Sequence, residues 1–174
     1  MAHELSLAEL IEGCTGWRAL KTPDGHRADL LVCLPGVSPR AGMLAWVEHN
    51  RRRMVWRQYP AGVVLAEQKL AALSSLEDDH GVPAWFVVTL DSGRTIWHRV
   101  GFLADYRRRE RGGRTSATRD RWDVERVCLI DWGAFVGLSE ALRMIRLVAE
   151  RRASLAGGGV VGSPHGNDDG GDRA

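Results

Sequence analysis

The chain has 174 residues, 44% of them hydrophobic and 26% charged, and its formal net charge is only +2. These values are typical of a globular protein, so they exclude a chain that is disordered throughout, and the length suits one domain. No apolar run approaches the roughly 18 residues of a membrane span, and the N-terminus MAHELSLAEL lacks a signal-peptide pattern. We therefore expect no membrane association.

The three cysteines are Cys14, Cys33 and Cys128. They form no CxxC pair and have no Cys/His spacing typical of a zinc site. An odd number of cysteines without such spacing favours free thiols in a reducing compartment. We therefore expect a cytoplasmic protein without structural zinc.

A short helix and three strands are expected in the first part of the chain. Ser6 and Glu9 form a capping-box pattern for a helix that continues to about Gly13. The turn signals Thr-Pro-Asp-Gly and Pro-Gly then separate apolar segments. These segments predict strands at residues 16–20, 28–34 and 43–48.

The second part of the chain predicts helices and further strands. Leu65, Leu70, Leu73 and Leu76 form a helical stripe that ends before Gly81. Strands are expected at residues 84–90, 95–100 and 126–131. A last helix, capped by Ser139, is expected at about 140–153.

This order predicts the fold class. A strand–helix–strand unit over residues 43–90 requires a crossover, and therefore at least one parallel pair of strands. We predict an α/β (α+β) domain with a mixed central β-sheet flanked by helices, over residues 1–153. Residues 154–174 are rich in Gly and Asp and are expected to form a disordered tail.

Arginine supplies most of the positive charge, and it is clustered. A stretch at about 105–122, YRRRERGGRTSATRDRW with its flanks, is expected to be an exposed loop. Guanidinium groups suit phosphate oxygens, so these clusters are candidate nucleic-acid contacts, although a solvated surface would give the same pattern. The candidate phosphate-binding residues are Arg51, Arg52, Arg53, Arg107, Arg108 and Arg109.

Two acids lie at the ends of expected strands. Asp29 is near the start of the second strand and Glu48 is at the end of the third. If these strands are hairpin neighbours, the two carboxylates meet at one edge of the sheet. Paired carboxylates suit Mg²⁺ or Mn²⁺, which can generate hydroxide and neutralise a phosphate. In the alternative, Asp29 caps a turn and Glu48 simply faces solvent.

The order of these segments resembles the PD-(D/E)XK nuclease superfamily, in particular its VRR-NUC and Holliday-junction-resolvase-like branch. Asp29 matches the motif's aspartate and Glu48 the glutamate of Glu-x-Lys. Leu65-Ala66-Glu67-Gln68 matches the start of the glutamine-bearing helix, and HGVPAWFVV matches the strand that follows it. The resemblance covers residues 4–100 and implies a restriction-endonuclease-like core.

The resemblance also implies a function and a set of site residues. It implies a Mg²⁺- or Mn²⁺-dependent endonuclease or junction resolvase that hydrolyses DNA phosphodiester bonds, with possible dimerisation and branched substrates. The metal ligands would be Asp29 and Glu48, and Gln68 and Lys69 would line the catalytic site. His49 alternates to the other face of the strand and is not expected to be a ligand.

Two positions depart from the motif of this superfamily. The lysine of Glu-x-Lys falls on Asn50, and the proline before the aspartate falls on Ala28. Arg51, Lys69 or another basic residue brought near the site can replace the missing lysine. Asn50 also keeps open the alternative of a catalytically inactive, nuclease-like DNA-binding or assembly module. An unrelated α/β domain with a regulatory role is a third hypothesis.

Overall fold

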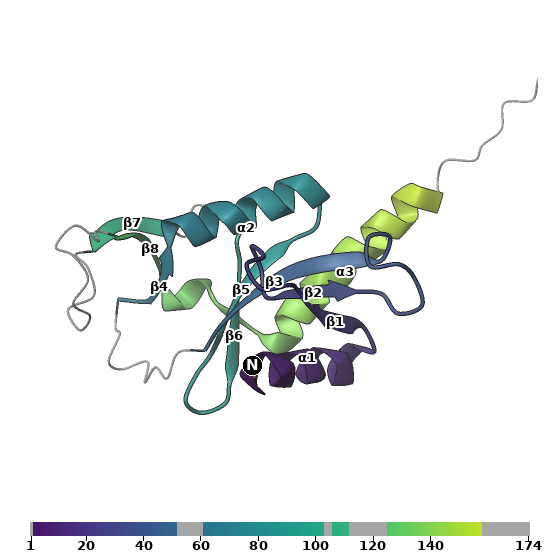
Figure 1. Ribbon diagram of the computed structural model, residues 1–174, viewed down its shortest axis with the longest axis horizontal. Helices are drawn as coiled ribbons and strands as arrows, with labels where there is room; N and C mark the ends of the chain where they lie inside the picture. Colours follow the sequence, from purple (N-terminus) through teal and green to yellow (C-terminus); the bar gives the residue numbers. More distant parts are fainter. Residues whose placement is uncertain (1, 52–60, 103–105, 112–124, 158–174) are drawn as a thin grey trace, which may run out of the picture.

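A six-stranded mixed sheet forms the centre of the protein (Figure 1). The computed structural model describes residues 2–51, 61–102, 106–111 and 125–157. The strand order in the sheet is β1-β2-β3-β5-β6-β9. These strands span Arg18–Lys21 (β1), Leu30–Cys33 (β2), Met43–Arg51 (β3), Ala84–Thr89 (β5), Thr95–Arg99 (β6) and Val136–Gly137 (β9).

The pairing of the strands confirms the mixed sheet. Strands β3 and β5 are parallel, with Glu48 beside Phe86 in the register. The other neighbours in this sheet are antiparallel, including β2 and β3, which are consecutive along the chain. The chain between β3 and β5 includes helix α2 (Glu67–His80), as the predicted crossover requires.

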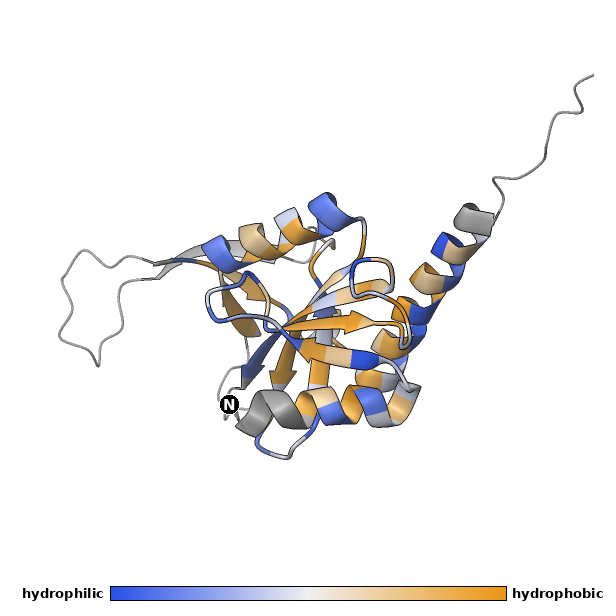
Figure 2. Cartoon of the chain, turned by 45° about the vertical axis from the view of Figure 1, so that its right-hand side comes forward, coloured by the Kyte–Doolittle hydropathy of each residue, from blue (hydrophilic) through white to orange (hydrophobic). Residues whose placement is uncertain are grey.

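Helices cover both faces of the sheet. Helix α2 packs on one face, where Leu73 joins a core with Trp46 and Phe86. Helices α1 (Ala2–Thr15) and α3 (Leu138–Gly157) pack on the other face against residues such as Val47 and Trp85. Figure 2 shows the predominantly hydrophobic strands in the centre, with polar residues gathered on the surrounding helices and loops. Within the described ranges, no helix is long and apolar enough to span a bilayer.

A second, three-stranded antiparallel sheet lies beside the first and was not expected. Its order is β4-β8-β7, with β4 at Val63–Ala66, β8 at Glu125–Ile130 and β7 at Tyr106–Arg111. Helix α2 starts at Glu67, so Leu65 belongs to a strand and not to the helix. A short 3₁₀ helix, η3 (Trp132–Ala134), connects β8 to β9.

Three expected boundaries differ in the structure. Helix α1 begins at Ala2, so Ser6 lies inside it instead of capping it. The expected arginine-rich loop is in part strand β7, and residues 112–122 lie outside the described ranges. Helix α3 continues to Gly157, so the first residues of the expected tail are helical, and residues 158–174 are not described.

Candidate functional site

Asp29 lies directly before β2 and opposite Glu48 of β3. Leu30 pairs with Val47 in the antiparallel register, so the next step of that register places Asp29 beside Glu48. The Asp29 backbone N–H donates to the Val47 carbonyl at 3.0 Å. Its carboxylate Oδ2 accepts the His49 backbone N–H at 2.7 Å. Strand β3 therefore fixes both the backbone and the side chain of Asp29.

Glu48 is buried beneath helix α2. It lies two residues after Trp46 on β3, so both side chains are on the α2 face of the sheet. The residue is only 3% exposed, and it is the one buried carboxylate among the residues with described burial. A carboxylate in such a place is costly unless a cation or hydrogen-bond donor compensates for lost hydration.

Lys69 supplies that compensation. Its ammonium group forms an ion pair with Glu48 Oε1, and 43% of the Lys69 side chain is exposed. Lys69 belongs to the first turn of α2, which follows β4 without an intervening loop. The pairing of β4 with β8 fixes where this turn begins. The structure thus brings together three of the four predicted catalytic residues.

Gln68 is the fourth predicted catalytic residue, and it is not part of this contact. It lies in the same turn as Lys69 and is exposed. Its side chain forms no hydrogen bond or ion pair with Asp29, Glu48 or Lys69 in the described part of the chain. Gln68 is therefore next to Lys69 along the chain but is not joined to Asp29 or Glu48.

The carboxyl group of Glu48 titrates far from its usual range. Its pKa is raised from 4.5 to about 7, and burial is the largest cause. The charge of Asp29 and a hydrogen bond with the Asp29 side chain contribute to this rise, whereas the hydrogen bond and charge of Lys69 oppose it. The two carboxyl groups therefore lie close enough to affect each other, and the protonated form of Glu48 is favoured well above the usual pH range of a glutamate.

The neighbours of Glu48 on β3 point in two directions. The His49 ring is hydrogen-bonded to the Thr89 hydroxyl at 2.8 Å, so it does not face α2. This agrees with the prediction that His49 lies on the other face of the strand from Glu48. Asn50 is half-buried and alternates back to the Glu48 face of the strand. The position of the missing motif lysine therefore faces the same side as the ion pair of Lys69.

The donor set of this site fits a hard divalent cation. One oxygen of Asp29 accepts the His49 N–H and one oxygen of Glu48 pairs with Lys69, and the two carboxyl groups also interact with each other. Carboxylate oxygens are the ligands that Mg²⁺ and Mn²⁺ prefer, usually one or two per ion with water completing the shell. In the described part of the chain, no group of three or more His, Cys, Asp or Glu side chains forms a fuller metal site.

The structure does not describe the side chains of the predicted phosphate-binding arginines. Arg51 ends strand β3, and Arg107, Arg108 and Arg109 lie in β7, but the described side chains do not include them. Arg52 and Arg53 fall outside the described residues altogether. The proposed contacts of these arginines with phosphate therefore stay predictions.

Comparison with solved structures identifies the fold. Hjc, a Holliday junction resolvase from Archaeoglobus fulgidus, is similar with a TM-score of 0.52 and 13% identity, over 79% of this chain and 90% of that chain. D212, a nuclease from a fusselovirus, has a TM-score of 0.50 and 12% identity, over 87% of this chain and 88% of that chain. No protein-family model matches the chain, and no curated protein matches it. The protein therefore has a nuclease/resolvase-like fold, and the predicted α+β class is confirmed.

Proposed function

We propose that the protein is a metal-dependent endonuclease of the PD-(D/E)XK type that hydrolyses DNA phosphodiester bonds. The observation that carries this proposal is the convergence of Asp29, Glu48 and Lys69 on one side of the sheet. Two acids and a lysine are the functional groups of the motif that the sequence resembles. The similarity of the fold to a junction resolvase and a viral nuclease supports the same reading.

Asp29 and Glu48 are proposed as the ligands of one Mg²⁺ or Mn²⁺ ion. When bound, such an ion supplies a hydroxide nucleophile near neutral pH and neutralises charge on the phosphate. The hydrogen bond from His49 N–H orients the Asp29 carboxylate for this task. Burial of Glu48 keeps water away from one side of the site. A buried, ionised carboxylate is costly without a compensating charge, so burial favours the binding of a cation there.

Lys69 is proposed to perform the role of the motif lysine that Asn50 lacks. The ammonium group reaches Glu48 from helix α2 instead of from β3, so the same charge is delivered from another element. At this place it can hold the attacking water or stabilise the charge that develops on the phosphate. Gln68, exposed in the same turn, is proposed as a contact to the substrate.

DNA is the proposed substrate, and branched DNA is included because one similar structure is a Holliday junction resolvase. The arginines at 51–53 and 107–109 are proposed to bind the phosphate backbone, and a homodimer would allow two strands to be cut. We also propose a cytoplasmic location, where three free thiols would stay reduced.

A cleavage assay on linear duplex and four-way-junction DNA, with Mg²⁺ or with a chelator, tests this function. We expect metal-dependent cleavage that Glu48→Ala abolishes and that Lys69→Met lowers by about 10²–10⁴-fold. Lys21→Met, which changes the only other lysine of the chain, is the matched control and should retain the wild-type rate. Equal rates for Lys69→Met and Lys21→Met would contradict the role of Lys69.

An inactive DNA-binding or assembly module is the second candidate function. Asn50 favours it, because the strand position that carries lysine in the motif cannot supply a cation here. This candidate predicts DNA binding that weakens steeply with salt, together with no cleavage under any metal condition. Replacing Arg107, Arg108 and Arg109 together would then flatten the salt dependence.

A further inference from the structure

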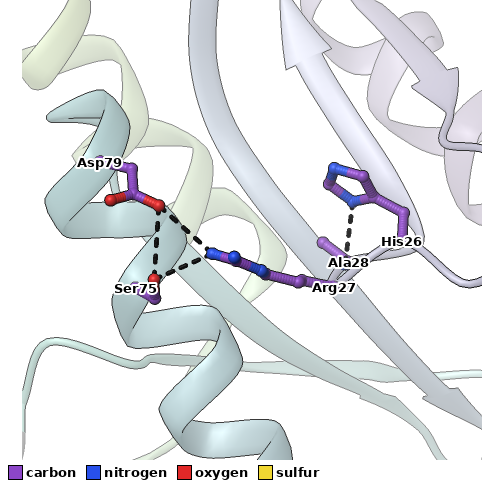
Figure 3. Close-up of polar contacts among 5 residues, drawn as sticks. All are labelled: His26, Arg27, Ala28, Ser75 and Asp79. Atoms are coloured by element: carbon purple, nitrogen blue, oxygen red, sulfur yellow. Dashed lines mark hydrogen bonds and ion pairs between the residues drawn. The ribbon is translucent and has the colours of Figure 1, made fainter.

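The loop before Asp29 is tied to helix α2 by a surface cluster of three side chains. Arg27 Nη1 donates to Ser75 Oγ at 2.9 Å and to Asp79 Oδ2 at 3.2 Å. The Ser75 hydroxyl donates to the same Asp79 oxygen at 3.3 Å. Figure 3 shows Arg27 reaching from the loop to these two residues on α2. The contact joins parts of the chain that are far apart in sequence.

The loop itself is closed by short-range hydrogen bonds. The Thr22 N–H donates to the Asp29 carbonyl at 2.9 Å, and the Thr22 hydroxyl donates to the Ala28 carbonyl. His26 N–H donates to the Pro23 carbonyl at 3.1 Å, and Ala28 N–H donates to His26 Nδ1 at 3.2 Å. A displacement of Arg27 is therefore transmitted to Asp29, two residues further along.

Trp46 provides a second contact between the same elements. The His26 ring stacks on it with centroids 5.1 Å apart and an interplanar angle of 28°. His80, at the end of α2, packs against it with centroids 5.3 Å apart. Trp46 and Glu48 share one face of β3. The loop, β3 and α2 thus meet next to the acid pair.

We propose that Arg27 is a positioning residue for Asp29, acting through Ser75 and Asp79. Helix α2 carries Lys69 at its first turn and the partners of Arg27 nearer its end. The contacts of Arg27 with Ser75 and Asp79, called the clamp below, therefore hold the segment that carries Asp29 at a fixed place on α2. The same helix carries the Lys69 ammonium group that pairs with Glu48. This inference rests on the proposed function of the acid pair, because positioning matters only if Asp29 and Glu48 act together.

The His49 amide gives a direct readout of this clamp, because its hydrogen is bound by Asp29 Oδ2. Amide hydrogen exchange is measured on the metal-free protein for wild type, Arg27→Ala, Asp79→Ala and the double variant. We expect the His49 amide to exchange up to about fivefold faster in each single variant. The double variant should exchange no faster than Arg27→Ala alone, since Arg27→Ala already removes the contacts with both Ser75 and Asp79. Amides within β5 and β6 should keep their rates.

Arg143→Ala is the matched control, because it removes another exposed arginine–carboxylate pair, with Glu140 of α3. It should leave the His49 amide unchanged. An unchanged His49 rate in Arg27→Ala, or equal acceleration of the β5 and β6 amides, would overturn the clamp. The same variants are then titrated with Mn²⁺, and Arg27→Ala should bind up to about fivefold more weakly than Arg143→Ala.

The two readouts separate the clamp from the proposed function. A wild-type protein that binds no Mn²⁺ would refute the metal site, while the exchange of the His49 amide would still decide whether Arg27 holds Asp29. Fast exchange in Arg27→Ala with unchanged Mn²⁺ affinity would refute the positioning role.

Discussion

Replacing Glu48 by glutamine is expected to stabilise the metal-free protein at alkaline pH, although it removes a residue of the candidate site. Glutamine has nearly the shape of the protonated acid and cannot ionise. The wild-type carboxyl has a pKa of about 7 in the folded protein against 4.5 in an unfolded chain, and burial is the main cause. Folding therefore favours the protonated form, and stability is lost as the pH rises through 7.

The size of this effect follows from the two pKa values. Their difference corresponds to about 3 kcal/mol of folding free energy once the group is ionised in both states. This loss of folding free energy has only begun at pH 5 and is nearly complete at pH 8. It therefore grows by about 2–3 kcal/mol between the two pH values. Glu48 is 3% exposed, so screening by solvent does little to reduce this value.

Chemical denaturation at pH 5 and pH 8, with a chelator present, measures the effect. The free energy of unfolding of Glu48→Gln minus that of wild type should increase by about 2–3 kcal/mol from the lower to the higher pH. Glu150→Gln, which removes an exposed carboxylate from α3, should show no such increase. A pH-independent difference for Glu48→Gln would refute the description of Glu48 as a buried acid with a raised pKa.

Three further predictions follow from the geometry. The apparent Mg²⁺ affinity should fall about tenfold between pH 8 and pH 6 as Glu48 becomes protonated. Calorimetric titration at the two pH values measures this change, and equal affinities would contradict the prediction. Adding Asn50→Lys to Lys69→Met should raise the cleavage rate at least about tenfold over Lys69→Met alone, because both positions face Glu48. An unchanged rate in the double variant would argue against equivalent roles for the two positions. Gly62→Ala should lower the free energy of unfolding by about 2–4 kcal/mol, since Gly62 has a φ of 116° and an added Cβ would overlap the Ile130 carbonyl. Gly13→Ala, where an added Cβ on α1 meets open space, should instead stabilise the protein. Thermal denaturation distinguishes these two glycine variants.

The main sheet was predictable because its strands carry strong local signals. The apolar runs around β2, β3 and β5 are buried on both faces, and the order of the elements required the observed parallel pair. Asp29 and Glu48 could be predicted as neighbours for the same reason, since hairpin strands place the start of one beside the end of the other.

The second sheet was missed because two of its three strands lack a pattern of their own, whereas the third, β8, was expected at residues 126–131. Strand β4 is four residues long, and its apolar residues run directly into the leucine stripe of α2. Strand β7 reads YRRRER, with no alternation of apolar residues. Strand β8, which lies between them, supplies the buried residues that hold this sheet together.

The contacts that complete the site depend on packing that no local pattern encodes. The sequence marked Lys69 as a candidate, but its ion pair with Glu48 requires the docking of α2 on β3. The contact of Arg27 with Ser75 and Asp79 likewise joins a loop to a helix across the fold. The burial that shifts the pKa of Glu48 arises from the same docking.

Titration of the protein with Mn²⁺ at pH 8 tests the central claim most directly, because it measures whether Asp29 and Glu48 hold an ion together. We predict one bound ion per chain, lost in Asp29→Ala and in Glu48→Ala and retained in Glu150→Gln. Binding of Mn²⁺ by both alanine variants with wild-type affinity would contradict the account.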